Sequence, residues 1–452
     1  MTDVGEVRAQ PELKRAIGPK LLLFFVIGDI LGTGIYALTG SVAGKIGGAL
    51  WLPFLLAFVV AFLTAFSYLE LVGKYPQAAG AALYTHKAFG INFLTFMVTF
   101  TVMASGVTSA ATASKAFGET YLRQFIELPT WAVAAVFILG LALINFRGVG
   151  ESVKANVVLT CIELSGLLLI IFVGVYAVAQ GRGEPSRLVE INTGETGAFL
   201  AITAATSLAF FAMVGFEDSV NMAEECHDPP RIFPKAMLTG MAVAALIYVL
   251  VAVLSSMLVP AAELAAAKSG ALFLVLEAGA PGFPLAVFGA IGLFAVVNSA
   301  LINMLMASRL LYGMSNERIL PTIFGRVHPT RRTPWFSIVF TSVLALILVM
   351  SVDITALGGT TALLLLGVFT IVNVAVLVLR RDEVSHDHFR APSWTPWVGI
   401  VLCGFLATPL SGRPLQEFLI AGVLLVVGAI LWFLNRMFVG RVDVDATRLG
   451  KS

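Results

Sequence analysis

The stretch "GDILGTGIY", Gly28–Tyr36, interrupts an otherwise apolar segment of 24 residues, Leu21–Gly44. A segment of that length can cross a lipid bilayer as a helix. Each glycine lowers helix propensity by about 1 kcal/mol relative to alanine, and an ionised aspartate in hydrocarbon costs several kcal/mol more. Three glycines together with Asp29 and Thr33 therefore predict a membrane helix that is interrupted in its middle.

The composition of the whole chain is that of an integral membrane protein. Of its 452 residues, 58% are apolar and 12% are charged, whereas soluble domains contain about 25% charged residues. We therefore expect the lipid bilayer to surround most of the chain. A net charge of +2 and the lack of a soluble basic region exclude a nucleic-acid partner. The three cysteines form no disulfide framework.

Hydropathy divides the chain into twelve predicted spans, which make one transporter-like domain, 21–437, between an N-terminal arm, 1–20, and a tail, 438–452. The predicted spans are 21–44, 48–73, 91–117, 130–147, 153–178, 197–222, 235–259, 283–310, 334–352, 357–380, 395–411 and 415–437. The outer insert Pro260–Gly282 is expected to hold a short surface helix.

The distribution of basic residues predicts the orientation. With the N-terminus in the cytoplasm, the cytoplasmic segments hold 22 of the 29 lysines and arginines, and the outer loops hold six. Cytoplasmic loops carry the excess of these residues in membrane proteins. Both termini are therefore expected in the cytoplasm of a cell bearing this protein in its plasma membrane.

A second interruption is predicted in the sixth span. "FFAMVGFEDSV", Phe210–Val220, places Gly215 at mid-span and follows it with Glu217 and Asp218. Interruptions in the first and sixth spans are typical of a five-plus-five inverted repeat, here 21–178 and 197–380 with 395–437 outside it. The fold class is thus all-α integral membrane, with helices 1 and 6 unwound at the midplane.

Interrupted helices present unpaired backbone groups that can bind a zwitterion. The N–H groups at the start of a half-helix suit an anion, so we expect Gly32, Thr33 and Gly34 to cradle a carboxylate. Carbonyl groups at the end of a half-helix suit an ammonium group. An alternative interpretation is that Gly28 and Gly32 form a small-residue face for helix packing.

Four motifs in order resemble those of amino acid permeases of the amino acid–polyamine–organocation superfamily. They are "GDILGTGIYALTG" in the first span, "YPQAAGAALYTHKAFG" after the second, "FFAMVGFEDSVNMAEECHDPPRIFPKAM" in and after the sixth, and "ASRLLYGMSNERILP" at the end of the eighth. The resemblance covers almost the whole chain. It implies the twelve-helix fold of the leucine-transporter type.

The resemblance also implies secondary active transport of amino acids by alternating access, as proton-coupled symport or as exchange. The substrate carboxylate would bind the amides of Gly32, Thr33 and Gly34. Phe211 or Phe216 would close the site as a gate. The substrate amino group would meet backbone carbonyls, namely those near Ile30 and those of Phe211, Ala212 and Val214.

Buried carboxylates are the candidates for ion coupling, because charges inside a membrane are costly and usually functional. Several family members carry a lysine in the fifth helix where this chain has Glu163, which we interpret as a proton carrier. Asp29 and Glu217 are further candidates, although Glu217 could simply cap a half-helix. Sodium is the alternative coupling ion, for which Asp29, Ser299 and Glu163 could supply oxygen ligands.

Two other functions remain possible at this stage. A polyamine or organic-amine transporter of the same fold is favoured by Asp29, whereas the lack of an acid in the third span weakens a strict arginine or lysine carrier. A receptor that binds an amino acid without transporting it is disfavoured by the short arm and tail. No catalytic motif, phosphate-binding loop or zinc pattern is present, so neither an enzyme nor a cofactor is expected. Oligomeric state cannot be inferred from the sequence.

Overall fold

The computed structural model describes residues 17–439, apart from 78–79, 148–151, 193, 195–196 and 317–318. Most of the predicted arm and tail therefore lies outside the described residues. Within this part of the chain the secondary structure is helical, with one isolated β-bridge between Ile17 and Cys226. The continuous long helices are α3 (Trp51–Lys74), α5 (Asn92–Ala116), α6 (Thr130–Arg147), α7 (Ser152–Ala179), α9 (Pro229–Leu258), α12 (Leu285–Asn316), α14 (Ile354–Leu379) and α16 (Leu415–Val439).

Ten helical stretches of the described chain are long and apolar enough to cross a membrane. Two further apolar helices, α13 (Trp335–Ser351) and α15 (Thr395–Leu406), coincide with predicted spans but are shorter. At 1.5 Å per residue, α15 covers about 18 Å of a hydrocarbon core about 30 Å thick. The twelve-span arrangement therefore stays a prediction at these two helices.

Two of the ten stretches are interrupted. The first consists of α1 (Pro19–Leu31) and α2 (Thr33–Ile46), separated by Gly32 alone. The second begins with α8 (Gly197–Ala209) and continues through two 3₁₀ segments, η4 (Phe210–Met213) and η5 (Asp218–Glu225).

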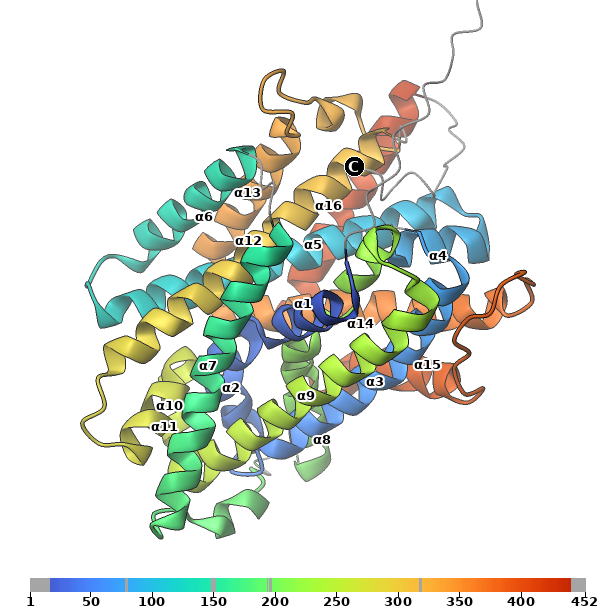
Figure 1. Ribbon diagram of the computed structural model, residues 1–452. Coiled ribbons are helices and arrows are strands. Elements are labelled where there is room, and N and C mark those ends of the chain that lie inside the picture. The colour runs from blue at the N-terminus through green and yellow to red at the C-terminus, as the bar shows by residue number, and fades with distance from the viewer. Residues whose placement is uncertain are drawn as a thin grey trace, which may run out of the picture.

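Short helices occupy both ends of the molecule (Figure 1). The outer insert forms two short helices, α10 (Ala261–Ala267) and α11 (Ala271–Gly279), where one was predicted. At the opposite end lies α4 (Gly80–Phe89), in a segment that the sequence analysis assigned only to a loop. Six of its ten residues are buried, so its contacts with the bundle stabilise it as a helix.

Glycines allow α1 to pack closely against its neighbours near the centre of the molecule (Figure 1). A side chain at Gly28 would place its Cβ 1.9 Å from Thr160 Oγ1 on α7. One at Gly240 on α9 would come within 2.8 Å of Val26. Gly28 therefore has the packing role considered for it, because α7 leaves no room for a larger residue.

Two ion pairs, one partly and one fully buried, link the ends of helices. Glu70 on α3 accepts bonds of 2.8 and 2.7 Å from the Arg380 guanidinium, just after α14. At the other end of the molecule, Arg413 donates to Glu417 at 2.6 Å. Both pairs are bidentate or multiply hydrogen-bonded, which is the condition under which buried charges are tolerated.

Candidate functional site

The first interruption exposes one helix end and one helix start to the same space. Gly32, with φ −41° and ψ −152°, ends α1 and precedes α2. The first N–H groups of a helix have no partner within it, so the amides at the start of α2 are available to a ligand. The carbonyl of Ile30 accepts a hydrogen bond of 2.5 Å from the Tyr248 hydroxyl on α9.

The second interruption has a backbone that only glycine adopts easily. Gly215 has φ +126°, in the region that side chains disfavour. Its N–H donates a 2.9 Å hydrogen bond to Glu217 Oε2. Glu217 thus satisfies a backbone amide of the interruption itself, three residues before η5 begins at Asp218.

The two interruptions are in direct contact. A Cβ at Gly215 would lie 2.6 Å from the Asp29 carbonyl oxygen, and one at Gly34 would lie 2.4 Å from Ala212 Cα. The backbone of one interruption therefore packs against the backbone of the other. Larger residues at these positions would push the two segments apart.

A cavity opens between the interruptions and α12. Its empty volume, including the solvent space to which it opens, is about 310 Å³. Two polar groups on its wall, Asp29 Oδ2 and the Thr33 hydroxyl, have no hydrogen-bond partner in the described structure. The Thr33 side chain is 1% exposed. The cavity is lined by Asp29, Ile30, Gly32, Thr33, Gly34, Ser109, Phe211, Val214, Gly215, Asp218, Ser299 and Asn303.

Most of the residues singled out in the sequence therefore lie around one space. Ala212 and Phe216 do not line it. Ala212 packs against Gly34 instead. The buried Phe216 ring packs against Tyr68 and Phe369, at centroid distances of 5.7 and 5.3 Å. Of the two candidate gates, only Phe211 lines this cavity.

Glu163 lies on α7, outside the cavity. Its side chain is fully buried, and neither carboxyl oxygen has a hydrogen-bond partner in the described structure. The Tyr36 hydroxyl donates to its backbone carbonyl at 2.6 Å. Asp29 is within electrostatic range of Glu163, Glu217 and Asp218, so the four carboxyl groups belong to one region.

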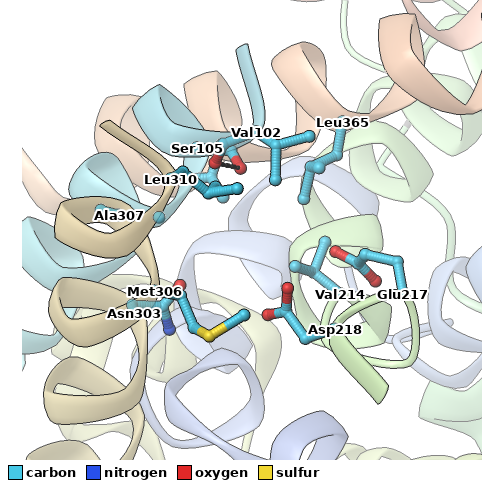
Figure 2. A pocket seen from close by; sticks show the side chains of 12 residues that line it. Val102, Ser105, Val214, Glu217, Asp218, Asn303, Met306, Ala307, Leu310 and Leu365 are labelled. Atoms are coloured by element: carbon cyan, nitrogen blue, oxygen red, sulfur yellow. Dashed lines mark hydrogen bonds between the residues drawn. The ribbon is translucent and has the colours of Figure 1, made fainter. Parts of the chain in front are cut away.

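Two further cavities continue from the first. One, whose empty volume including the adjoining solvent space is about 350 Å³, lies between η5 and helices α5, α12 and α14. Figure 2 shows Asp218 and Glu217 on one side of it and Ser105, Val102 and Leu310 on the other. The next, of about 330 Å³, is lined by residues of α3, α4 and α5 together with Asn221. The first and second cavities share the lining residues Val214 and Asn303. The second and third share Val102 and Glu217.

Comparison with known proteins agrees with this architecture. The family model described as "Amino acid permease" matches residues 17–433.

The chain belongs to the amino acid permease family.

Relatives of this permease are transporters. It is 25% identical to the branched-chain amino acid permease of Bacillus subtilis, over 95% of each chain. It is 28% identical to the methylthioribose transporter of the same organism, over 93% of each chain. Human cationic amino acid transporter 4 is 26% identical over 85% of this chain and 62% of its own length. The permease is therefore a multi-pass membrane protein and not an enzyme.

Sequence reasoning missed two polar residues of the permease site. Ser109 lines the cavity from α5, and Tyr248 reaches the end of α1 from α9. The signal available in the sequence was weak: a lone tyrosine or serine in an apolar span. Neither position could be aligned with the interruptions without knowing how α5 and α9 pack.

Proposed function

We propose that this permease is a secondary carrier that moves amino acids across the membrane by alternating access. The observation that supports this most strongly is the cavity between the two interruptions. It brings together the residues at the start of α2, an unpartnered Thr33 hydroxyl and an unpartnered Asp29 oxygen around one space. These groups are complementary to a small zwitterion.

The substrate would lie across the first interruption. Its carboxylate would accept hydrogen bonds from the amides of Gly32, Thr33 and Gly34, where the start of α2 favours negative charge. Its amino group would approach Asp29 and the backbone carbonyls near Ile30, together with those of Phe211, Ala212 and Val214. Phe211 would then cover the bound molecule.

Transport would follow from the repeat architecture. We propose twelve spans, with repeats 21–178 and 197–380, unwound at the midplane in the first and sixth spans. The protein would lie in the plasma membrane with both termini in the cytoplasm, as the basic residues favour. One bundle would rock against the other around the fixed site.

Glu163 is the proposed coupling residue. A buried carboxyl without a partner is maintained by holding a proton or by binding a cation. Its place beside α1, near Asp29, would let proton release alter the packing of the first span. Sodium, bound by Asp29, Ser299 and Glu163, is the alternative coupling ion.

Uptake into proteoliposomes tests the proposal. We would measure accumulation of radiolabelled amino acids with an inward pH gradient and no sodium, for the wild type, Glu163→Gln and Glu127→Gln. Glu127 is exposed in a loop and is a matched control. We expect Glu163→Gln to lose proton-driven accumulation but keep exchange between internal and external substrate, while Glu127→Gln behaves as the wild type.

Other results would change the assignment. Sodium-driven uptake unaffected by pH would replace the proton with sodium. Accumulation of diamines, but not of amino acids, would favour the organic-amine carrier. If labelled amino acids bind but neither gradient nor counter-substrate moves them, the receptor hypothesis would replace transport.

A further inference from the structure

The three adjacent cavities described above have one lining residue in common. Asp218, the first residue of η5, lines the cavity at the interruptions and both of the cavities beyond it. Figure 2 shows its side chain between Met306 and Val214 in the middle cavity. A substrate bound at the first interruption would therefore extend its side chain past this carboxyl group.

The charges that line the cavities are all negative. Asp29, Glu217 and Asp218 are acidic, and no lysine, arginine or histidine lines any of the three. Buried cations that the structure describes elsewhere have partners of their own: Arg413 is bonded to Glu417, and Lys74 donates to the carbonyls of Leu379 and Asp382. The cavities thus contain no internal counter-charge for the acids.

The acidic side chains differ in whether their carboxyl oxygens accept hydrogen bonds from the protein. Glu217 has one oxygen engaged by the Gly215 amide. No side-chain hydrogen bond or ion pair joins Asp218 to another described residue, and Figure 2 shows its carboxyl group facing the middle cavity. Beside it, the buried Thr33 hydroxyl also lacks a partner and faces the first cavity.

We propose that Asp218 determines specificity for a substrate whose side chain carries a positively charged nitrogen. This inference rests on the proposed amino acid transport: the α-amino and α-carboxylate groups bind at the first interruption, and the side-chain ammonium group pairs with Asp218. Asn303 and Ser105, which face the same middle cavity, can accept hydrogen bonds from its remaining protons.

A definite order of substrates follows. Lysine or ornithine would neutralise Asp218, whereas norleucine, which has the lysine skeleton without the terminal nitrogen, would leave this carboxyl group unpaired. A hydrogen bond to a charged group corresponds to roughly 10- to 100-fold in affinity. Glutamate would place like charges together and bind weakest.

Competition binding tests the proposal on the full-length protein in detergent. Displacement of a radiolabelled amino acid by lysine, ornithine, norleucine and glutamate would be measured for the wild type, Asp218→Asn, Asp218→Glu and Asp387→Asn. Asp387 is in an exposed loop and is the matched control. We expect Asp218→Asn to lose most of the preference for lysine over norleucine while still binding norleucine, and Asp218→Glu to keep part of the preference.

Several outcomes would overturn the inference. Equal affinities for lysine and norleucine in the wild type would do so while leaving amino acid transport intact. A preference for lysine that persists in Asp218→Asn would also overturn it. So would thermal stabilisation of the wild type by sodium alone, if Asp218→Asn abolishes that stabilisation. Binding of 1,5-diaminopentane but of no amino acid would keep the role of Asp218 and overturn the transport of amino acids. If no amino acid or amine binds, both proposals fail.

Discussion

At the scale of single residues, the site depends on positions where only a hydrogen atom fits. Gly34 and Gly215 let the two interruptions stay in contact. A Cβ added at either position would collide with the backbone or a side chain of the other segment. The glycines of the quoted motif thus have separate tasks. Gly28 packs against α7, whereas Gly32 lines the cavity and lies close to Ser299, whose Oγ would be 3.0 Å from an added Cβ.

Replacing Gly215 by alanine tests this contact. Gly215→Ala must accept a φ of +126° and a Cβ 2.6 Å from the Asp29 carbonyl oxygen. Gly282→Ala is the control, because Gly282 also has positive φ, +87°, but no atom within 4 Å of the added Cβ. Backbone strain costs about 1–3 kcal/mol at either site. Only Gly215→Ala should also abolish substrate binding, measured by displacement of labelled amino acid; equal effects of the two variants would refute the contact.

At the scale of elements, a backbone carbonyl near the end of one helix accepts a hydrogen bond from a side chain of another element. The Tyr248 hydroxyl on α9 satisfies the Ile30 carbonyl near the end of α1. Arg413 does the same at α8, donating a 3.0 Å bond to the Ser207 carbonyl while it also bonds Gly359, Leu406 and Glu417. These two helix ends are therefore stabilised by hydrogen bonds from side chains of other elements.

Tyr248→Phe should destabilise the permease by about 1–3 kcal/mol, the cost of leaving a buried polar group unpaired. Tyr84→Phe is a matched control, because the buried Tyr84 hydroxyl has no partner in the described structure. Removing it should be neutral or stabilising. Unfolding of both variants in detergent would be compared; a Tyr84→Phe change as large as that of Tyr248→Phe would contradict the assignment.

Arg413 and Glu417 should show strong coupling. Arg413→Met leaves Glu417, which is 2% exposed, with an uncompensated buried charge and should cost about 3–5 kcal/mol. Adding Glu417→Gln removes that charge, so the double variant should regain part of the stability. A double-mutant cycle on the melting temperature measures this; additive effects would mean that the pair contributes little.

At the scale of the whole molecule, the three cavities connect the interruptions with the end of the bundle where α4 lies. Asn221 lines the last of them, and Ser186 is exposed near the other end. With both termini in the cytoplasm, the cavities would open toward the cytoplasm.

Labelling of introduced cysteines tests that direction. In a Cys161→Ser background, a membrane-impermeant maleimide should label Asn221→Cys in inside-out vesicles and Ser186→Cys in right-side-out cells. Native Cys226 should stay unlabelled, because burial raises the pKa of its thiol to about 12. The thiol is then protonated, and so unreactive, in the assay range of about pH 7 to 8. Labelling of Asn221→Cys only from outside would reverse the proposed orientation.

The sequence could predict those features that depend on residues close together in the chain. Long apolar runs and mid-span glycines are local patterns, so the helical membrane class and the residues around both interruptions were accessible. The helix α4 was missed because burial against the bundle stabilises it, and its sequence alone does not. Phe216 was taken as a gate candidate although it packs against Tyr68 and Phe369, contacts that join residues far apart in the chain.

The hydrogen bond from Tyr248 to Ile30 has a consequence for the biogenesis of the protein. The two residues are 218 positions apart, and ribosomes add about 5–20 residues per second. The first span, with its glycines and aspartate, is therefore made roughly 10 to 40 seconds before its partner. Until then the Ile30 carbonyl lacks the hydroxyl group that satisfies it in the folded protein.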